Sequence, residues 1–563
     1  MLLFPSFILA MFISMLLIPP LIKYAPKIGL VDIPDARKVH VKAIPRVGGV
    51  AMVIAAVIPM LLWLPKNQEF ISFLVSVMII FFFGVWDDRS DLNYKIKFFG
   101  QILAVILIVT IGDVQIRYIP FFGLEPISEL ISIPLTIFTL LGITNAMNLV
   151  DGLDGLAGGT TLIGFGAIGL LSYVSTETGA SGNPFIAMIA ICIMGSTLGF
   201  LRFNTHPARI FMGDTGSQFL GFCIGTLAIM ITQQEELPYN PGIPLILLCW
   251  PIFDTLMVMA IRISQGKSPF VADKNHIHHR LLALGLDHYE VVFVIYLAQA
   301  CLAVIAFTLR NYSDSLVILT YLTINIVAII FIRWASLNKG TFQIIESDPT
   351  DNCNNIGTAH SNRLGIYIKR VLNKNFLADA ALYVSLLTLP IAFVFAMLVM
   401  DSSLDPKESF PIALVSLIIS AAMFIIGLIS RNDPFKLLER IGVYMIAALM
   451  VYIINNIPTE FGDITHLING FFVVLAIIVV VGFRCSRDDK FEVTTLDFLV
   501  IFTVIMLNVT PMIPSAYAVF GLRLILFFYM LEFLISSISK LQNILRLSSC
   551  LMLLIIAVRG FLI

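Results

Sequence analysis

Four short polar strings interrupt an otherwise strongly apolar chain, and they carry the residue types that do chemistry. They are Asp87-Asp88-Arg89-Ser90-Asp91, the segment from Asn145 to Gly155, Gly213-Asp214-Thr215-Gly216-Ser217 and His276-Ile277-His278-His279. Each string lies in or beside a gap between apolar stretches, and the Lys and Arg counts of these gaps place all four on one side of a membrane. Carboxylates, carboxamides and imidazoles gathered on one face indicate an enzyme that works on a charged lipid headgroup.

The first string favours cation or proton chemistry. On a helix end, Asp87 and Asp88 are both close neighbours of Asp91 by the i,i+4 and i,i+3 spacings. Clustered carboxylates repel one another unless a cation, a proton or a basic side chain offsets their charge. The spacing therefore predicts a metal- or proton-handling site that faces a lipid phosphate, with a hydrated loop ending a helix as the alternative.

The second string predicts a polar ribbon of oxygen donors. Asn145, Asn148, Asp151 and Asp154 recur every three residues, so they drift slowly around a helix. Carboxylate and amide oxygens suit Mg²⁺, which also keeps several waters. The neighbouring glycines allow close backbone approach to a ligand. The alternative is a helix-breaking turn packed by small residues.

The third and fourth strings, with one basic segment, are typical of anion binding. Asp214 opens an apolar helix, where it is either a simple cap or part of a phosphate site made by free N–H groups. The three imidazoles of the fourth string stand between Lys274 and Arg280. No Cys and few carboxylates lie beside them, so binding of a nucleotide's phosphates or sugar is favoured over zinc, and a hydrated basic loop is the alternative. Lys38 and Arg46 lie in a further basic, glycine-bearing segment.

The elements that must position these strings are membrane helices. The chain has 563 residues, of which 58% are hydrophobic and 13% charged, and its apolar runs of about 20 residues match a bilayer core. The runs are continuous and do not alternate, which excludes barrel strands. We expect an all-α, polytopic helical membrane protein with about 11 spans in a first part and about 7 in a second. The predicted spans are 4–24, 47–64, 69–86, 96–112, 129–148, 156–174, 184–201, 211–232, 243–264, 290–309 and 315–335, then 377–400, 410–430, 441–455, 467–483, 496–513, 517–537 and 545–562.

Charge distribution predicts both the orientation and the domains. Lys and Arg gather in alternate gaps along the whole chain, which puts the N-terminus outside and the four polar strings in the cytoplasm. We expect a catalytic membrane domain over 1–337, a polar cytoplasmic linker over 338–374 and an accessory helical membrane domain over 375–563.

Taken together and in this order, the strings resemble the polyprenyl-phosphate N-acetylhexosamine-1-phosphate transferases. The resemblance covers roughly residues 1–335 and involves five motifs. The His-Ile-His-His-Arg form is most similar to the bacterial branch that transfers GlcNAc-1-phosphate to undecaprenyl phosphate. The block after about Lys374 has no counterpart in the ordinary family pattern.

The resemblance implies a reaction and a set of site residues. A UDP-N-acetylhexosamine and undecaprenyl phosphate give a sugar-diphosphoryl lipid and UMP, with Mg²⁺, or alternatively Mn²⁺, as cofactor. It implies Asn148 and Asp214 as metal ligands, and Asp87 and Asp88 jointly as the acids that bind or deprotonate the lipid phosphate. The implied catalytic residues are Asp87, Asp88, Asp214, His276, His278 and His279, and the implied substrate-binding residues are Lys38, Arg46, Asp91, Lys97, Asn145, Asp151, Asp154 and Arg280.

The same resemblance implies a setting. We expect a multi-pass protein of the bacterial inner membrane that starts O-antigen, capsule or another envelope polysaccharide, with no nucleic-acid partner. A homodimer or partners in glycan assembly are further expectations. The competing hypothesis is a transporter, flippase or scaffold for lipid-linked sugars. Transporters place polar groups near the membrane midplane, whereas these crowd at cytoplasmic helix ends, which favours the enzyme.

Overall fold

The computed structural model describes residues 2–32, 43–122, 125–177, 184–233, 239–268, 276–337, 406–429, 436–456, 515–537 and 542–562, with parts of 390–400 and 468–479. The chain divides into two compact units, one of Met1–Phe342 with Thr494–Leu499, the other of Gln343–Val493 with Val500–Ile563. The predicted linker over 338–374 lies outside the described residues, so the roles assigned to the three expected domains stay predictions.

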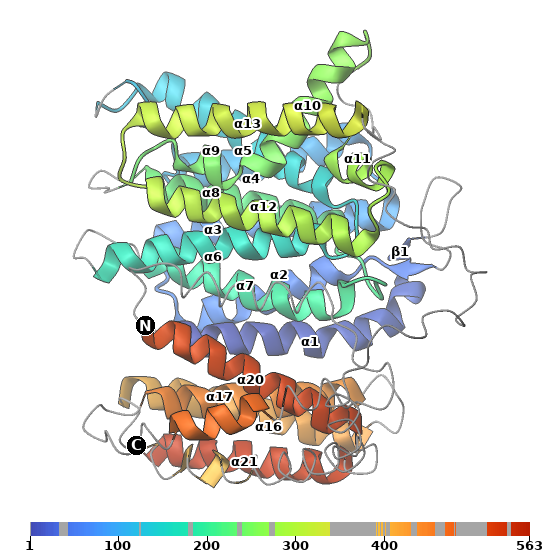
Figure 1. Ribbon diagram of the computed structural model, residues 1–563, viewed down its shortest axis with the longest axis vertical. Coiled ribbons are helices and arrows are strands. Elements are labelled where there is room, and N and C mark those ends of the chain that lie inside the picture. Colours follow the sequence, from blue (N-terminus) through green and yellow to red (C-terminus); the bar gives the residue numbers. More distant parts are fainter. Residues whose placement is uncertain are drawn as a thin grey trace, which may run out of the picture. The chain divides into compact units, whose positions relative to one another are not determined.

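The first unit is a bundle of helices with one short hairpin of strands (Figure 1). Its elements are α1 (Leu3–Ile28), β1 (Val31–Asp32), β2 (Ile44–Pro45), α2 (Gly48–Trp63), α3 (Gln68–Ser90), α4 (Tyr94–Thr110), α5 (Glu129–Val150), α6 (Leu156–Glu177), α7 (Pro184–Asn204), α8 (Gly213–Thr232), α9 (Ile243–Leu247), α10 (Cys249–Ser264), α11 (Ile277–Ala283), α12 (His288–Leu309) and α13 (Asp314–Leu337). Within the described residues, eight helices are long and apolar enough to cross a membrane. The expected all-α polytopic class is confirmed.

Helix α8 is the centre of this unit. Its apolar window is 100% buried, whereas that of α13 is 6% buried, so α13 lies at the periphery of the unit with most of its surface exposed. Helices α2, α3 and α5 all pack against α8. Small residues bring them close: a Cβ added at Gly84 of α3 would lie 2.6 Å from Thr215 Cα, and one added at Gly221 would lie 2.8 Å from Thr144 Cα of α5. Close backbone approach of this kind holds membrane helices together where burial from water does not act.

The expected single span over 243–264 is wrong in one respect, because it consists of two helices, α9 and α10, that are broken at Leu248. Pro251 explains the break, since its ring clashes with the carbonyl four residues earlier and it lacks the N–H that would bond there. That carbonyl, Leu247 O, accepts a hydrogen bond from Gln299 Nε2 of α12 at 2.9 Å. A side chain from another helix thus satisfies the freed backbone oxygen.

The second unit contains α16 (Pro406–Ile429), α17 (Lys436–Asn455), α20 (Ser515–Ser537) and α21 (Gln542–Leu562), with α16 packed on α21 and α17 on α20 and α21. Arg523 is buried within it and donates to Asn455 Oδ1 at 2.9 Å and Asn469 Oδ1 at 2.8 Å. Its guanidinium lies 5.3 Å from the centre of the Phe472 ring. The predicted span over 496–513 lies outside the described residues.

Candidate active site

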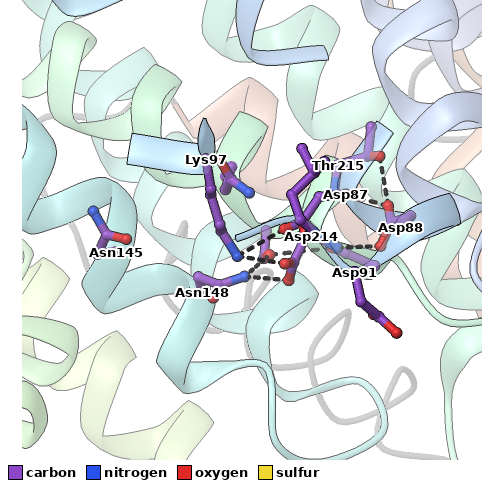
Figure 2. A network of polar contacts seen from close by, with 12 residues as sticks. Asp87, Asp88, Asp91, Lys97, Asn145, Asn148, Asp214 and Thr215 are labelled. Carbon is purple, nitrogen blue, oxygen red and sulfur yellow. Dashed lines mark hydrogen bonds and ion pairs between the residues drawn. The ribbon is translucent and has the colours of Figure 1, made fainter. Parts of the chain in front are cut away.

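The ends of four helices bring charged side chains to one place. Asp87 lies in the last turn of α3, Lys97 in the first turn of α4, Asn148 in the last turn of α5 and Asp214 in the first turn of α8. Figure 2 shows these side chains pointing toward one another. The apolar runs predicted from the sequence end at these residues, which is why the polar groups meet at one end of the bundle.

Two carboxylates share the ammonium of Lys97. Lys97 Nζ lies 3.1 Å from Asp87 Oδ2 and forms a close hydrogen bond with Asp214 Oδ2. Asn148 Nδ2 donates to Asp214 Oδ1 at 2.7 Å and lies at the same distance from Ser217 Oγ. Asp87 Oδ1 accepts the Leu92 N–H at 2.7 Å, and its buried Oδ2 is the oxygen that faces Lys97.

Asp88 has a different environment from Asp87. Its Oδ1 accepts the Asp214 N–H at 2.7 Å, and its Oδ2 accepts the Thr215 N–H at 3.0 Å and the Thr215 hydroxyl at 2.5 Å. It therefore caps α8 from outside that helix, where an anion favourably meets free N–H groups. Gly213 has φ +66°, and a Cβ there would overlap the Asp88 carboxylate. The sequence pattern predicts one joint role for Asp87 and Asp88. In the structure, Asp88 is the residue that fixes the start of α8.

Backbone hydrogen bonds from the segment around the start of α2 hold the same end of α8. The Phe211 N–H donates to Pro45 O at 2.8 Å, and the N–H groups of Gly48 and Gly49 donate to Phe211 O and Met212 O, each at 2.9 Å. These bonds join the basic, glycine-bearing segment to the backbone just before Asp214.

Arg46 joins this segment to the first string. Its guanidinium lies 2.5 Å from Asp32 Oδ1 and 3.6 Å from Asp91 Oδ1, and the Asp91 side chain is 94% exposed. Asp91 thus points away from the carboxylate cluster and toward solvent (Figure 2). Lys38 lies outside the described residues.

The polar ribbon of the second string separates into different environments. Asn145 exchanges hydrogen bonds with Gln101, which also donates to Gln218 Oε1 at 2.9 Å. The structure does not bring Asn145 to the carboxylates, and Figure 2 shows it apart from them. Asp151 follows α5, where burial, together with the charges of Asp214, Asp88 and Asp154, raises its pKa to about 7. Asp154 contacts a histidine instead, with its Oδ2 2.8 Å from His206 Nδ1.

The histidine string forms the start of α11 and is anchored by an acid that the sequence analysis missed. His276 Nδ1 lies 2.8 Å from Asp254 Oδ2, and the Ile277 N–H donates to Asp254 Oδ1 at 2.8 Å. Both side chains are buried. The signal for Asp254 was its position inside an apolar run, where an ionisable residue is costly and needs a partner.

His278 connects the histidine string to the second string. Its ring packs against Gly152, since a Cβ added there would overlap Nε2. Burial, followed by the neighbouring His279, lowers the His278 pKa to about 4, so the imidazole is neutral near pH 7. Its Nε2 is buried without a hydrogen-bond partner among the described residues. The rings of His278 and His279 lie 4.3 Å apart, and Arg280 follows on the same helix.

Residues 70–232 match the family described as glycosyl transferase family 4. The chain is 39% identical over 302 residues to a Bacillus subtilis protein named probable undecaprenyl-phosphate N-acetylglucosaminyl 1-phosphate transferase, covering 53% of this chain and 83% of that one. The chain belongs to this family of polyprenyl-phosphate N-acetylhexosamine-1-phosphate transferases. It is also 32% identical over 289 residues (50% of this chain, 78% of the relative) to the undecaprenyl-phosphate alpha-N-acetylglucosaminyl 1-phosphate transferase of Yersinia pestis. Over 300 residues it is 37% identical (48% and 73%) to the decaprenyl-phosphate N-acetylglucosaminephosphotransferase of Mycolicibacterium smegmatis.

The family match includes the carboxylate cluster and excludes the histidine string and the second unit. The cluster also fits a divalent cation by its own chemistry. Asp87 and Asp214 face one ammonium, and Asp88 lies beside them, bound to the Asp214 N–H, so three carboxylates gather next to a single lysine. Oxygen donors with excess negative charge are the ligands that Mg²⁺ takes. Asp214, and Asn148 after a turn of its amide group, would hold the ion.

Proposed function

We propose that this enzyme transfers N-acetylglucosamine-1-phosphate from UDP-GlcNAc to undecaprenyl phosphate, releases UMP and requires Mg²⁺. The observation that carries the proposal is the carboxylate cluster at the helix ends, where Asp87 and Asp214 share Lys97. The names of its relatives, which act on undecaprenyl or decaprenyl phosphate and transfer N-acetylglucosamine-1-phosphate, support the acceptor and the sugar.

The chemistry is a phosphoryl substitution. An oxygen of the lipid phosphate attacks the β-phosphorus of the UDP-sugar, a new P–O bond forms, and the bond from that phosphorus to the bridging oxygen breaks. The electron pair leaves with UMP, and no proton is exchanged when the lipid phosphate enters fully ionised. Positioning and charge neutralisation are the main contributions a protein makes to such a reaction.

The chain's own residues divide this work. Lys97 offers its ammonium to phosphate oxygens, and Asp87 Oδ2 lies beside it. When bound, Mg²⁺ would neutralise charge on the diphosphate. Asp88 holds the first N–H groups of α8 and so fixes the position of Asp214. His276, oriented by Asp254, and neutral His278 face the nucleotide-sugar from α11.

The positive-inside distribution supports an active site on the cytoplasmic side of a bacterial inner membrane. The product would be the first lipid-linked sugar of an envelope polysaccharide. We also propose that the second unit is accessory, because the recognised chemistry lies before Leu337.

The test is UMP release by the purified full-length protein in lipid nanodiscs. UMP should form only when UDP-GlcNAc, undecaprenyl phosphate and Mg²⁺ are all present, and the lipid product should gain one N-acetylhexosamine and one phosphate by mass. EDTA should stop the reaction, and Mg²⁺ or Mn²⁺ should restore it. Movement of a preformed lipid-linked sugar across the bilayer without UMP release would support the transporter and overturn the proposal.

A further inference from the structure

A second polar cluster lies apart from the shared Lys97, and neither the family match nor the proposed reaction uses it as a unit. Asp154 comes from the turn between α5 and α6, His206 from the connection between α7 and α8, and His288 is the first residue of α12. One ligand atom from each of the three side chains lies within 4.8 Å of the others. Three separate segments of the chain therefore converge on one point.

The contacts within this cluster are short. Asp154 Oδ2 lies 2.8 Å from His206 Nδ1, and His288 Nε2 lies 3.1 Å from the Asp154 backbone oxygen. The His206 and His288 rings are stacked, with centroids 4.1 Å apart and planes inclined by 23°. Two imidazoles and one carboxylate thus bring three ligand atoms, one from each side chain, close together.

The donor set selects a class of metal. Two imidazole nitrogens and one carboxylate oxygen are ligands of Zn²⁺ and similar transition metals, with bonds of about 2.0–2.2 Å. Two ligands of one such ion lie about 3–4 Å apart, so binding would draw the three atoms, now within 4.8 Å, together and turn His288 Nε2 from the Asp154 backbone oxygen toward the ion. Mg²⁺ prefers oxygen alone. The cluster therefore differs in selectivity from the site at Asp214.

The surroundings suit an ion that enters from solvent. The side chains of His206 and Asp154 are 37% and 20% exposed, so an ion and a completing water have access. Outer contacts hold the ligands: the Ala208 N–H donates to Asp154 Oδ2 at 3.0 Å, and the Tyr289 hydroxyl donates to His206 O at 3.0 Å. Partners of this kind orient metal ligands and raise affinity.

We propose that Asp154, His206 and His288 bind a single transition-metal ion of the Zn²⁺ class, which fastens the turn after α5, the segment before α8 and the start of α12. An ion that binds the folded chain alone stabilises it by mass action. This role concerns how three segments are held, and it comes in addition to the substrate contact that the resemblance implies for Asp154.

The test uses the full-length protein in detergent, stripped with EDTA and returned to excess Mg²⁺ so that the oxygen site is supplied. Zn²⁺ should bind at one ion per chain by elemental analysis and raise the Tm. Co²⁺ at the same site should give the absorption bands of a nitrogen- and oxygen-coordinated ion. His206→Ala and His288→Ala should each weaken binding by roughly 100-fold or more and abolish the Tm rise.

A matched control separates this cluster from the other histidines. His279→Ala removes an imidazole from the string on α11 and should leave the stoichiometry and the Tm rise unchanged. Asp154→Asn keeps an acceptor oxygen for the Ala208 N–H, so it reports on the metal if the alanine variants fail to fold. Zn²⁺ binding that survives in His206→Ala and His288→Ala, or that is lost in His279→Ala, overturns the proposal. So does a stripped protein whose Tm Zn²⁺ does not change, since the cluster is then hydrogen-bonded only.

Discussion

Replacing Asp88 with asparagine tests whether Asp88 positions the start of α8 or contacts the substrate itself. Asp88 accepts three hydrogen bonds at the start of α8, two from Thr215 and one from the Asp214 N–H. Asparagine has one acceptor oxygen, so it keeps the bond from Asp214 and sets an amide NH₂ against the Thr215 N–H, while the Thr215 hydroxyl can turn to accept from that NH₂. The capping charge at the helix N-terminus is lost at the same time.

The magnitude follows from those contacts. A hydrogen bond to a charged group contributes about 1.5–3 kcal/mol, which is the loss expected for the bond from the Thr215 N–H, and the hydroxyl bond is replaced by a weaker neutral one. Removal of a buried charge offsets part of this loss, and we expect a net destabilisation of about 1–3 kcal/mol. Asp214 lies in the turn that Asp88 holds in place. Loss of that support should displace this metal ligand, so the concentration of Mg²⁺ that gives half-maximal activity should rise.

Asp87→Asn is the matched comparison. Its Oδ2 faces Lys97, whose ammonium keeps Asp214 as a second partner, so the substitution should lower the Tm less than Asp88→Asn does while kcat falls steeply. Thermal unfolding in detergent and UMP release against Mg²⁺ concentration measure both quantities. An Asp88→Asn protein with unchanged Tm and unchanged Mg²⁺ dependence, but no turnover, would refute the positioning role and place Asp88 on the substrate.

The remaining predictions use the same assays. Asp214→Asn should insert and fold normally and lose nearly all transfer, and near-normal turnover would refute its role as a metal ligand. In a panel of UDP-sugars, UDP-GlcNAc should be used and UDP-MurNAc-pentapeptide rejected, and rejection of UDP-GlcNAc would exclude the preferred donor, with a 6-deoxy-N-acetylhexosamine next to test. A chain ending near Asn373 should keep its topology and release UMP; a stably inserted but inactive product would show that the second unit completes the catalytic fold. The pKa of Asp151 rises from 3.8 in the unfolded chain to about 7 in the folded one. Ionised Asp151 therefore destabilises the fold, and this cost grows as the pH rises from 3.8 to about 7. The Tm of Asp151→Asn should exceed that of the wild type by more at pH 8 than at pH 5.

The helices were predictable because each follows from a continuous apolar run whose length matches the bilayer. The meeting of Asp87, Lys97, Asn148 and Asp214 was predictable in kind, since the runs end at these residues and alternate in direction. What a sequence pattern does not contain is the distinction between Asp87 and Asp88. Neighbours along a helix point about 100° apart, and only the packing of α3 on α8 decides which carboxylate meets the free N–H groups.

The misses have a common physical cause, which is pairing between distant segments. Asp254 partners His276 from 22 residues away, and Asn145 partners Gln101 from 44 residues away. In a membrane interior each such polar group requires a partner, but several partners of suitable type are available in the sequence. The sequence therefore predicts that each of these polar groups has a partner, but which residue is the partner depends on how the helices pack.

The geometry of α8 explains why so many glycines stand near its start. Asp88 approaches Gly213 from α3, and Gly49 approaches Gly216 from α2, at distances that leave no room for a Cβ. These contacts fix the first turn of α8 from two directions, and that turn carries Asp214. A reaction that depends on positioning and charge requires this carboxylate to stay in place while the phosphate groups exchange. The glycines thus allow the close contacts that hold Asp214 in place. A Gly213→Ala protein should lose sugar-phosphate transfer although all of its charged residues are unchanged.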